Sequence, residues 1–323
     1  MLYVNSENVT NAQIQEVIKT GITKVVVTSN VSRIPERMFY DCEYMLSVVI
    51  SEGVTCIGEE AFWSCSHLEK VTVPNTVKTI EAGAFEGCMY LPTVNIPEGI
   101  KYIESRTFQG CKSLESITIP SSVTYIGNSA FSGVWTMTDI TIPGTVKTIE
   151  DYAFSTCHAL ERVTLLDGVV SIGDNAFSGC QALISITIPN TVTEIGIFAF
   201  SNCRALTTIV LPNKTISVTR GMFYSNRSLE EIILPEGVTS IEKEAFGHCQ
   251  KLSNIVIPNT VTYIGEYAFG DCRALTNITI PSSVTSIDSI AFDECINLTT
   301  ITGDAGSYAE TFAKEHGYTF VEK

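Results

Sequence analysis

The sequence predicts a single solenoid, a stack of twelve 23-residue repeats in which each repeat contributes one strand to a parallel ribbon. Phenylalanine recurs at a constant interval of 23 residues, twelve times from Phe39 to Phe292. The columns on either side of it keep the same register. Apolar residues make up 45% of the chain and charged residues only 17%, which is typical of a chain that buries a large core. Fixed periods of about 20–50 residues are typical of stacked repeats.

One repeat shows how the unit folds. Leu114–Ile119 ends in alternating apolar and polar residues, which predicts a strand with one buried face. Pro120 ends this strand because it has no N–H to donate. The serines at 121–122 form a turn, residues 123–126 return along the opposite face, and Phe131 fills the core. A unit of this kind cannot bury its own apolar face, so its neighbours must stack against it.

Ten of the eleven cysteines share one column, three residues after a phenylalanine. They are Cys42, Cys65, Cys88, Cys111, Cys157, Cys180, Cys203, Cys249, Cys272 and Cys295. Stacked identical rotamers do not supply the angle that a disulfide needs, and no CxxC pair suggests structural zinc. The column therefore predicts buried free thiols that pack as small hydrophobic groups. Cys56 lies outside the column and is the one candidate for an exposed thiol.

The unit CxxLxxIxIPxxVxxIGxxAFxxC resembles the BspA-like, or Treponema pallidum-type, class of leucine-rich repeats, over about residues 22–303. The resemblance implies a right-handed superhelix with a concave parallel β-sheet. It also implies a surface-displayed or secreted protein that acts in adhesion and protein binding. The sequence departs from the pattern at Val134, at 166–167 and at 214–220, which affects the fold only locally.

The two ends predict polar caps on one structural domain. Thr10 can begin a helix that runs to about Lys19, and residues 1–30 form an N-terminal cap. The repeats occupy residues 31–303. Residues 304–323 form a C-terminal cap, with a helix over 307–316 that Gly317 ends and a short strand after it.

No motif for catalysis or for a cofactor stands out. The four histidines occupy different columns, and no HExxH, GxSxG, P-loop or GxGxxG pattern is present. We therefore expect no enzyme activity, no cofactor and no metal. A net charge of −15 disfavours nucleic acid and anionic lipid surfaces as partners. No apolar run is long enough to insert into a membrane.

Two surfaces are candidates for binding a protein. The first is the ridge beside the turn that follows each phenylalanine, where aromatic and large side chains gather: Tyr40, Tyr44, Trp63, His67, Met89, Tyr90 and Trp135. Exposed aromatic side chains are common at binding hot spots. The alternative is that they pack against the N-terminal cap. The second surface is the outward face of the strands, which carries Glu69, Glu115, Asp139 and Glu161.

The favoured function is a monomeric, non-catalytic module that binds a host or matrix protein through one of these surfaces. A rigid spacer that presents another domain is the alternative, and an enzyme with an unrecognised site is a third. The resemblance implies the cell surface or the extracellular space. No secretory signal follows Met1, so the cytoplasm stays open as well.

Overall fold

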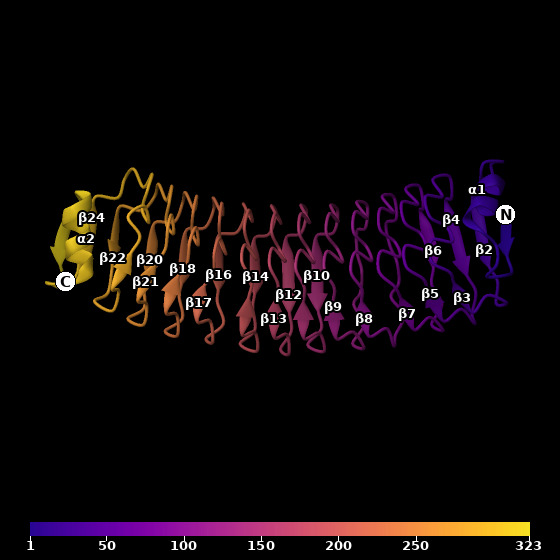
Figure 1. Ribbon diagram of the computed structural model, residues 1–323, viewed down its shortest axis with the longest axis horizontal. Helices are drawn as coiled ribbons and strands as arrows, with labels where there is room; N and C mark the ends of the chain where they lie inside the picture. The colour runs from indigo at the N-terminus through magenta and orange to yellow at the C-terminus, as the bar shows by residue number, and fades with distance from the viewer. The chain divides into compact units, whose positions relative to one another are not determined.

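The chain folds into two compact stacks of 23-residue coils. The computed structural model describes all residues, 1–323, and divides into Met1–Val169 (unit 1) and Val170–Lys323 (unit 2). Within each unit the strands of successive coils run parallel, side by side (Figure 1). The predicted repeat solenoid is therefore confirmed in both units. The prediction of one domain with boundaries after residues 30 and 303 stays a prediction.

Unit 1 contains one helix and twelve short strands. They are β1 (Leu2–Val4), α1 (Asn11–Ile18), β2 (Lys24–Val27), β3 (Arg33–Ile34), β4 (Ser47–Ile50), β5 (Cys56–Ile57), β6 (Lys70–Thr72), β7 (Thr79–Ile80), β8 (Tyr102–Ile103), β9 (Tyr125–Ile126), β10 (Asp139–Ile142), β11 (Thr148–Ile149) and β12 (Arg162–Leu165). The strand face consists of β1-β2-β4-β6 and of β10-β12. The two-residue strands form a second row, β3-β5-β7 and β8-β9-β11.

Unit 2 repeats this arrangement. Its elements are β13 (Ser171–Ile172), β14 (Ser185–Thr187), β15 (Glu194–Ile195), β16 (Thr208–Val210), β17 (Ser217–Val218), β18 (Glu231–Ile233), β19 (Ser240–Ile241), β20 (Asn254–Val256), β21 (Tyr263–Ile264), β22 (Asn277–Thr279), β23 (Ser286–Ile287), β24 (Thr300–Gly303), α2 (Tyr308–His316) and β25 (Thr319–Glu322). The strand face holds β14-β16-β18-β20 and β22-β24-β25, and the second row holds β13-β15 and β17-β19-β21-β23.

The phenylalanine column forms the centre of both cores. Neighbouring rings are stacked, with centroids 5.0–5.8 Å apart in unit 1 and 5.3–6.2 Å apart in unit 2. All twelve side chains are buried. Each ring therefore makes its main contacts with the coil before and the coil after it, as a stack of units that cannot fold alone requires.

The cysteine column is buried and free of disulfides, as the sequence predicts. It also makes a contact that the sequence does not reveal. Eight of the ten thiols donate to the carbonyl of the phenylalanine one coil earlier, as Cys65 Sγ does to Phe39 O at 3.0 Å and Cys249 Sγ to Phe223 O at 3.2 Å. Burial raises the pKa of the Cys249 thiol to about 12, so it stays protonated and can donate. Cys56 is half-buried.

The backbone around each phenylalanine adopts an unusual, repeated conformation. All 17 non-glycine residues with positive φ lie two residues before or two residues after a phenylalanine. The positive φ at these positions directs three N–H groups of one coil toward three carbonyls of the next coil. In the first coil Arg37, Phe39 and Asp41 donate to the carbonyls of residues 59, 61 and 63, at 2.7–3.0 Å. The hydrogen bonds offset a conformation that costs about 1 kcal/mol or more for each residue that carries a Cβ.

Glycine should relieve this cost. Thr156 is exposed and β-branched, with φ of 57°. We expect Thr156→Gly to raise the free energy of unfolding of unit 1 by about 0.5–1 kcal/mol. Thr164→Gly, in the middle of β12, should lower it by a similar amount. Urea unfolding followed by the fluorescence of Trp63 and Trp135 measures both variants. A change of the same sign in the free energy of unfolding of both variants would contradict the explanation.

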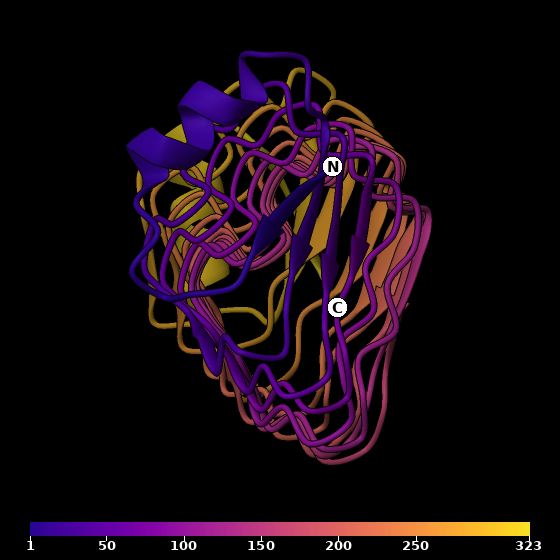
Figure 2. The same ribbon diagram turned by 90° about the vertical axis from the view of Figure 1, so that its right-hand side faces the viewer.

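Helix α1 covers the first coil. Thr10 caps it together with Gln13, as the sequence predicts. The helix lies against the first phenylalanine turn, beside the N-terminal strands (Figure 2). Asn11 Nδ2 donates to Tyr40 O at 2.9 Å, and Gln15 Nε2 donates to Asp41 O at 2.8 Å. These amides take the place of the N–H groups that a preceding coil would supply.

Both terminal caps include a strand. β1 pairs in parallel with β2, an element that the sequence prediction missed. At the other end α2 and β25 lie where they were predicted, and Gly317 ends α2 with φ of 78°. Phe312 of α2 continues the aromatic column, in an edge-to-face contact with Phe292 at a centroid distance of 5.9 Å.

The strand face of unit 1 is interrupted, although the sequence predicts one ribbon. Between β6 and β10 the only pairing is an isolated bridge of Thr93 with Ser116. In seven of the coils the N–H seven residues after phenylalanine donates to the previous coil, as Glu69 N does to Leu46 O at 2.9 Å. Pro92 occupies this position in the next coil and has no N–H, so this bond is missing between β6 and residues 93–96.

Candidate functional site

The inner part of the ridge is a fixed aromatic pair. The rings of Tyr40 and Trp63 stack with centroids 4.5 Å apart and planes 8° apart. The Arg37 guanidinium lies 5.5 Å from the Tyr40 ring centroid and also binds the Glu60 carboxylate at 2.7 Å. Both rings are half-buried. The stacking and the ion pair therefore fix these two rings in place.

The outer part of the ridge is open to solvent. Tyr44 is 58% exposed and Tyr90 is 56% exposed. His67 lies in the coil between them, with its ring 5.4 Å from that of Tyr90, and its Nδ1 is 3.0 Å from Glu43 O. Met89 is exposed beside Tyr90. Helix α1 reaches the backbone of the first turn but leaves these side chains uncovered.

Trp135 is separate from the cluster at the start of the ridge. It is exposed, and the Lys112 Nζ lies 4.3 Å from its ring centroid. On its other side the ring of His158 is 5.9 Å away. The structure therefore places two contacts within the predicted ridge, Tyr40 with Trp63 and His67 with Tyr90, and places Trp135 with a lysine and a histidine instead.

The four acidic residues predicted on the strand face all lie in unit 1, at its exposed surface. Asp139 pairs with Arg162, whose guanidinium also lies 3.5 Å from Glu161. The hydrogen bond from the Thr138 hydroxyl, followed by that from Arg162, lowers the pKa of Asp139. Glu69 and Glu115 form no ion pair. Asp139 and Glu161 are thus already paired with an arginine within the chain. Glu69 and Glu115 remain available for a basic partner.

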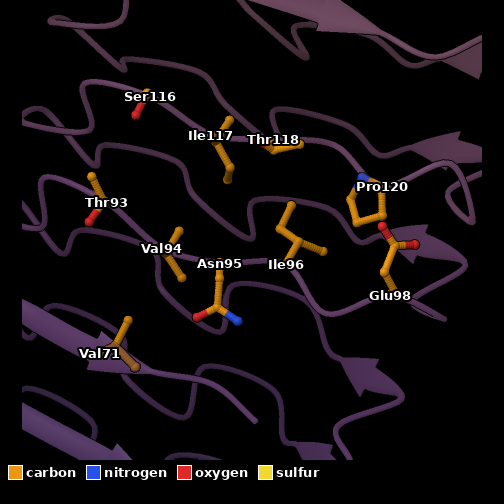
Figure 3. Close-up of a pocket in the computed structure, with 10 residues that line it drawn as sticks. All are labelled: Val71, Thr93, Val94, Asn95, Ile96, Glu98, Ser116, Ile117, Thr118 and Pro120. Carbon is orange, nitrogen blue, oxygen red and sulfur yellow. The ribbon is translucent and has the colours of Figure 1, made fainter. Parts of the chain in front are cut away.

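The interrupted stretch of the strand face contains two hollows. One is a cavity of about 370 Å³ between residues 93–98 and 116–120 (Figure 3). Thr93 and Ser116 lie at one end of it, and Glu98 and Pro120 lie at the other. The second, of about 380 Å³, lies between residues 117–119 and 139–143. We call residues 93–96 and 116–119, with the two hollows, the seam.

Unit 2 carries an exposed row that the sequence prediction missed. Val210, Ile233 and Val256 lie on neighbouring strands as direct partners, and they are 69%, 68% and 66% exposed. Most other coils have threonine at this position, ten residues after phenylalanine. The change from threonine to valine or isoleucine in three successive repeats was the available signal.

A buried carboxylate in unit 2 is held by three hydrogen-bond donors. The Asp271 side chain is 3% exposed and accepts hydrogen bonds from His248 at 2.9 Å, Gln250 at 2.8 Å and Arg273 at 2.5 Å. Burial alone raises its pKa, but these three donors outweigh burial and lower the pKa to about 2. Both carboxylate oxygens accept hydrogen bonds, so the cluster joins two neighbouring coils.

This carboxylate should make unit 2 sensitive to acid. The folded pKa lies below the unfolded value of about 3.9, so its contribution is complete above pH 4 and is lost as the pH falls toward 2. We expect the difference in free energy of unfolding between wild type and Asp271→Asn to shrink by about 2 kcal/mol between pH 5 and pH 2. Urea unfolding followed by circular dichroism measures it. The exposed Asp293→Asn is the control and should show no such convergence.

No group of three or more histidine, cysteine or acidic side chains is arranged to hold a metal ion. Neither helix has the length and the apolar composition that crossing a bilayer requires.

Comparison with known proteins identifies the repeat. A family model described as BspA type leucine rich repeat region, in six copies, matches residues 15–137, 124–252 and 216–306. A comparison with curated protein sequences finds no match.

Three solved bacterial structures are similar over most of their length. A leucine rich cell surface protein from Faecalibacterium prausnitzii is 31% identical, with a TM-score of 0.54, and the match covers 90% of this chain and 80% of that one. A leucine-rich repeat protein from Eubacterium ventriosum is 28% identical, with a TM-score of 0.58 and coverage of 91% and 88%. One from Bacteroides ovatus is 28% identical, with a TM-score of 0.51 and coverage of 86% and 92%.

Proposed function

Because this chain belongs to the BspA-type leucine-rich-repeat proteins, we propose that it is a non-catalytic module that binds a protein partner through its aromatic ridge. Leucine-rich-repeat solenoids are typically binding scaffolds rather than enzymes. The observation that carries the choice of surface is the exposure of Tyr44, His67 and Tyr90 in three successive coils whose first two also carry the stacked Tyr40–Trp63 pair.

The physical basis is the low cost of ordering these side chains. An aromatic ring buries a large area while losing few rotamers, and its polar edge can still form a hydrogen bond. Tyr40 and Trp63 are already fixed by stacking, so a partner would not have to immobilise them. The cell surface or extracellular location and the adhesive role are part of the same proposal, and the similarity to a cell surface protein supports them.

A second surface has an observation of its own. The row of Val210, Ile233 and Val256 places three large aliphatic side chains in water, which is unusual on a strand face that otherwise carries threonine. It would suit an apolar patch of a partner, flanked by basic groups that meet Glu230 and Glu231.

The experiment compares two variants of the full chain in capture of host-cell and extracellular-matrix proteins. Tyr44→Ala/Tyr90→Ala removes the ridge row. Val210→Thr/Ile233→Thr/Val256→Thr restores the residue that most repeats carry. We expect the ridge variant to lower the affinity for a captured protein at least tenfold, and the threonine variant to leave it within twofold.

The outcomes separate the candidates. Loss of capture only in the threonine variant would move the site to unit 2. Equal capture by wild type and both variants would remove both surfaces from consideration. Absence of any specific capture would favour the rigid spacer.

A further inference from the structure

We propose that the phenylalanine turn of the last coil, residues 289–296, binds a basic segment of a partner protein through two main-chain N–H groups that the fold leaves unused. The proposal rests on the same protein-binding role as the ridge, but it concerns a different surface, in unit 2.

The turn of each coil is normally held by the turn of the coil after it. In ten coils the N–H of the phenylalanine and the N–H two residues later both donate to carbonyls of the next coil, at 2.7–3.1 Å. The coil of Phe292 is followed by α2 instead of another coil, and the N–H groups of Phe292 and Glu294 donate to no atom of the chain. The unpaired groups of the seam face an adjacent coil, whereas these two have no coil opposite them.

Glu294 holds its N–H group in the direction that a further coil would need. Its φ is 59°, close to the 58° of Asp271 in the coil before, and Asp271 N donates to Asp293 O at 2.9 Å. In the other coils such a hydrogen bond offsets the cost of the left-handed conformation, whereas at Glu294 nothing offsets it. An acceptor supplied by a partner would therefore meet a donor that is already positioned.

The third N–H of the same turn shows that an oxygen from outside a following coil can serve. Ile290 N donates to the carboxylate of Asp288 at 3.1 Å. The N-terminal cap uses the same kind of substitution, since the amides of Asn11 and Gln15 donate to carbonyls of the first turn. Helix α2 supplies no such group to the two open N–H groups, so their acceptors have to come from another molecule.

A hollow of about 340 Å³ lies at the two donors, between residues 289–296 on one side and His316 and Tyr318 on the other. Its walls include Ile290 and Ile296, which are 42% and 74% exposed. The core below it is less covered than elsewhere, because Phe292 is 3% exposed and the other eleven phenylalanines of the column are 0–1% exposed. The hollow thus offers donors and apolar walls to a short segment.

Phe312 decides which residue can lie between the two acceptors. Within the stack the residue between two accepting carbonyls is a phenylalanine, as Phe62 lies between Ala61 O and Trp63 O. Beyond Phe292 the place of the next ring is filled by Phe312, at a centroid distance of 5.9 Å. A partner's segment therefore needs a small residue, such as glycine, between its two carbonyls.

Charge selects basic side chains on either side of that residue. Asp293 and Glu294 are exposed, line the hollow and form no ion pair, and His316 is the only basic residue beside them. The chain as a whole carries a net charge of −15. A free anion or a second copy of the chain is disfavoured, whereas a segment with lysine or arginine is favoured.

The test uses a synthetic probe, the peptide acetyl-Lys-Leu-Gly-Leu-Lys-amide, which has a leucine carbonyl on each side of glycine and a lysine at each end. We titrate it into the ¹⁵N-labelled full chain and follow amide chemical shifts. Saturable shifts at Phe292 and Glu294 are expected, with a Kd on the order of 1 mM, since a short segment makes few contacts. Phenylalanine in place of the glycine, or glutamate in place of both lysines, should weaken binding about tenfold.

Variants of the full chain test the same contacts from the protein side. Asp293→Lys should weaken the lysine peptide about tenfold and strengthen the glutamate peptide, while its main-chain carbonyl still accepts from Asp271 N. Ile296→Ala removes an apolar wall and should weaken the lysine peptide about threefold. Ile233→Ala is the matched control, because Ile233 is 68% exposed but lies on the strand face, and it should bind as wild type does.

Two results would overturn the proposal. One is the absence of saturable shifts at Phe292 and Glu294, or equal affinity for the lysine and glutamate peptides. The other is a response of these amides to sodium acetate and not to the peptide, which would make the hollow an anion site. Tyr44→Ala/Tyr90→Ala should bind the peptide as wild type does, so the ridge is tested separately.

Discussion

Replacing Phe131 with alanine is expected to lower the free energy of unfolding of unit 1 by about 3–5 kcal/mol, the largest effect of any single substitution we consider. The ring is fully buried between those of Phe108 and Phe154, at centroid distances of 5.4 and 5.0 Å. Its removal leaves a cavity that two neighbouring coils border. Because each coil is held only by its neighbours, the loss cannot be shared with the rest of a globular core.

Urea unfolding followed by the fluorescence of Trp63 and Trp135 measures this loss, because both tryptophans lie in unit 1. Phe131→Leu keeps most of the volume and should cost about 1–2 kcal/mol. Tyr102→Ala removes an exposed ring and should cost less than about 1 kcal/mol. A Phe131→Ala protein as stable as the Tyr102→Ala protein would show that the column is not the core of the unit.

Asn226→Ala should have the second largest effect, a loss of about 2–4 kcal/mol in unit 2. Asn226 is fully buried and stands where ten other repeats have cysteine. Its Nδ2 donates to Phe200 O at 3.0 Å, and its Oδ1 accepts from Cys203 N at 2.8 Å. Alanine would leave both main-chain groups buried and without these partners.

Asn226→Cys is the informative control for this position. A thiol there can donate to Phe200 O, as Cys249 does to Phe223 O. The Cys203 N–H can then turn to the Phe200 carbonyl, in the manner of Cys42 N with Phe39 O. We therefore expect Asn226→Cys to stay within about 1 kcal/mol of wild type in urea unfolding followed by circular dichroism. Equal losses for the alanine and cysteine variants would mean that volume, and not hydrogen bonding, decides this column.

Much of the fold could be predicted because its main signals are periodic. The column from Phe39 to Phe292 sets the length of the coil, and the cysteines and prolines beside it set the turn and the end of the strand. The helix from Asn11 and the helix before Gly317 follow from their caps. Strand β1 was missed because Leu2–Val4 is too short to show alternation and is defined only by its partner β2.

The details that matter for binding depend on contacts that periodicity does not encode. Pro92 is visible in the sequence, but its effect is to remove a hydrogen bond between coils, which becomes evident only when Glu69 is seen to make one. The ridge residues were found by their type, whereas the exposure of Tyr44 and the stacking of Tyr40 on Trp63 depend on where α1 lies. The left-handed positions around each phenylalanine include six glycines, but most carry other residue types, so composition marks them only in part.

The thiol column has a consequence for alkaline solutions. Burial raises the pKa of eight of its members, among them Cys42, Cys111, Cys157, Cys203 and Cys249 to about 12. In the unfolded chain a cysteine ionises near pH 8.5, so each of these groups favours unfolding by about 1.4 kcal/mol for every pH unit above that. Eight together amount to on the order of 10 kcal/mol at pH 9.5, comparable with the entire stability of an ordinary domain. Mild base should therefore destabilise both units, and dissolved oxygen would oxidise the exposed thiolates to disulfides.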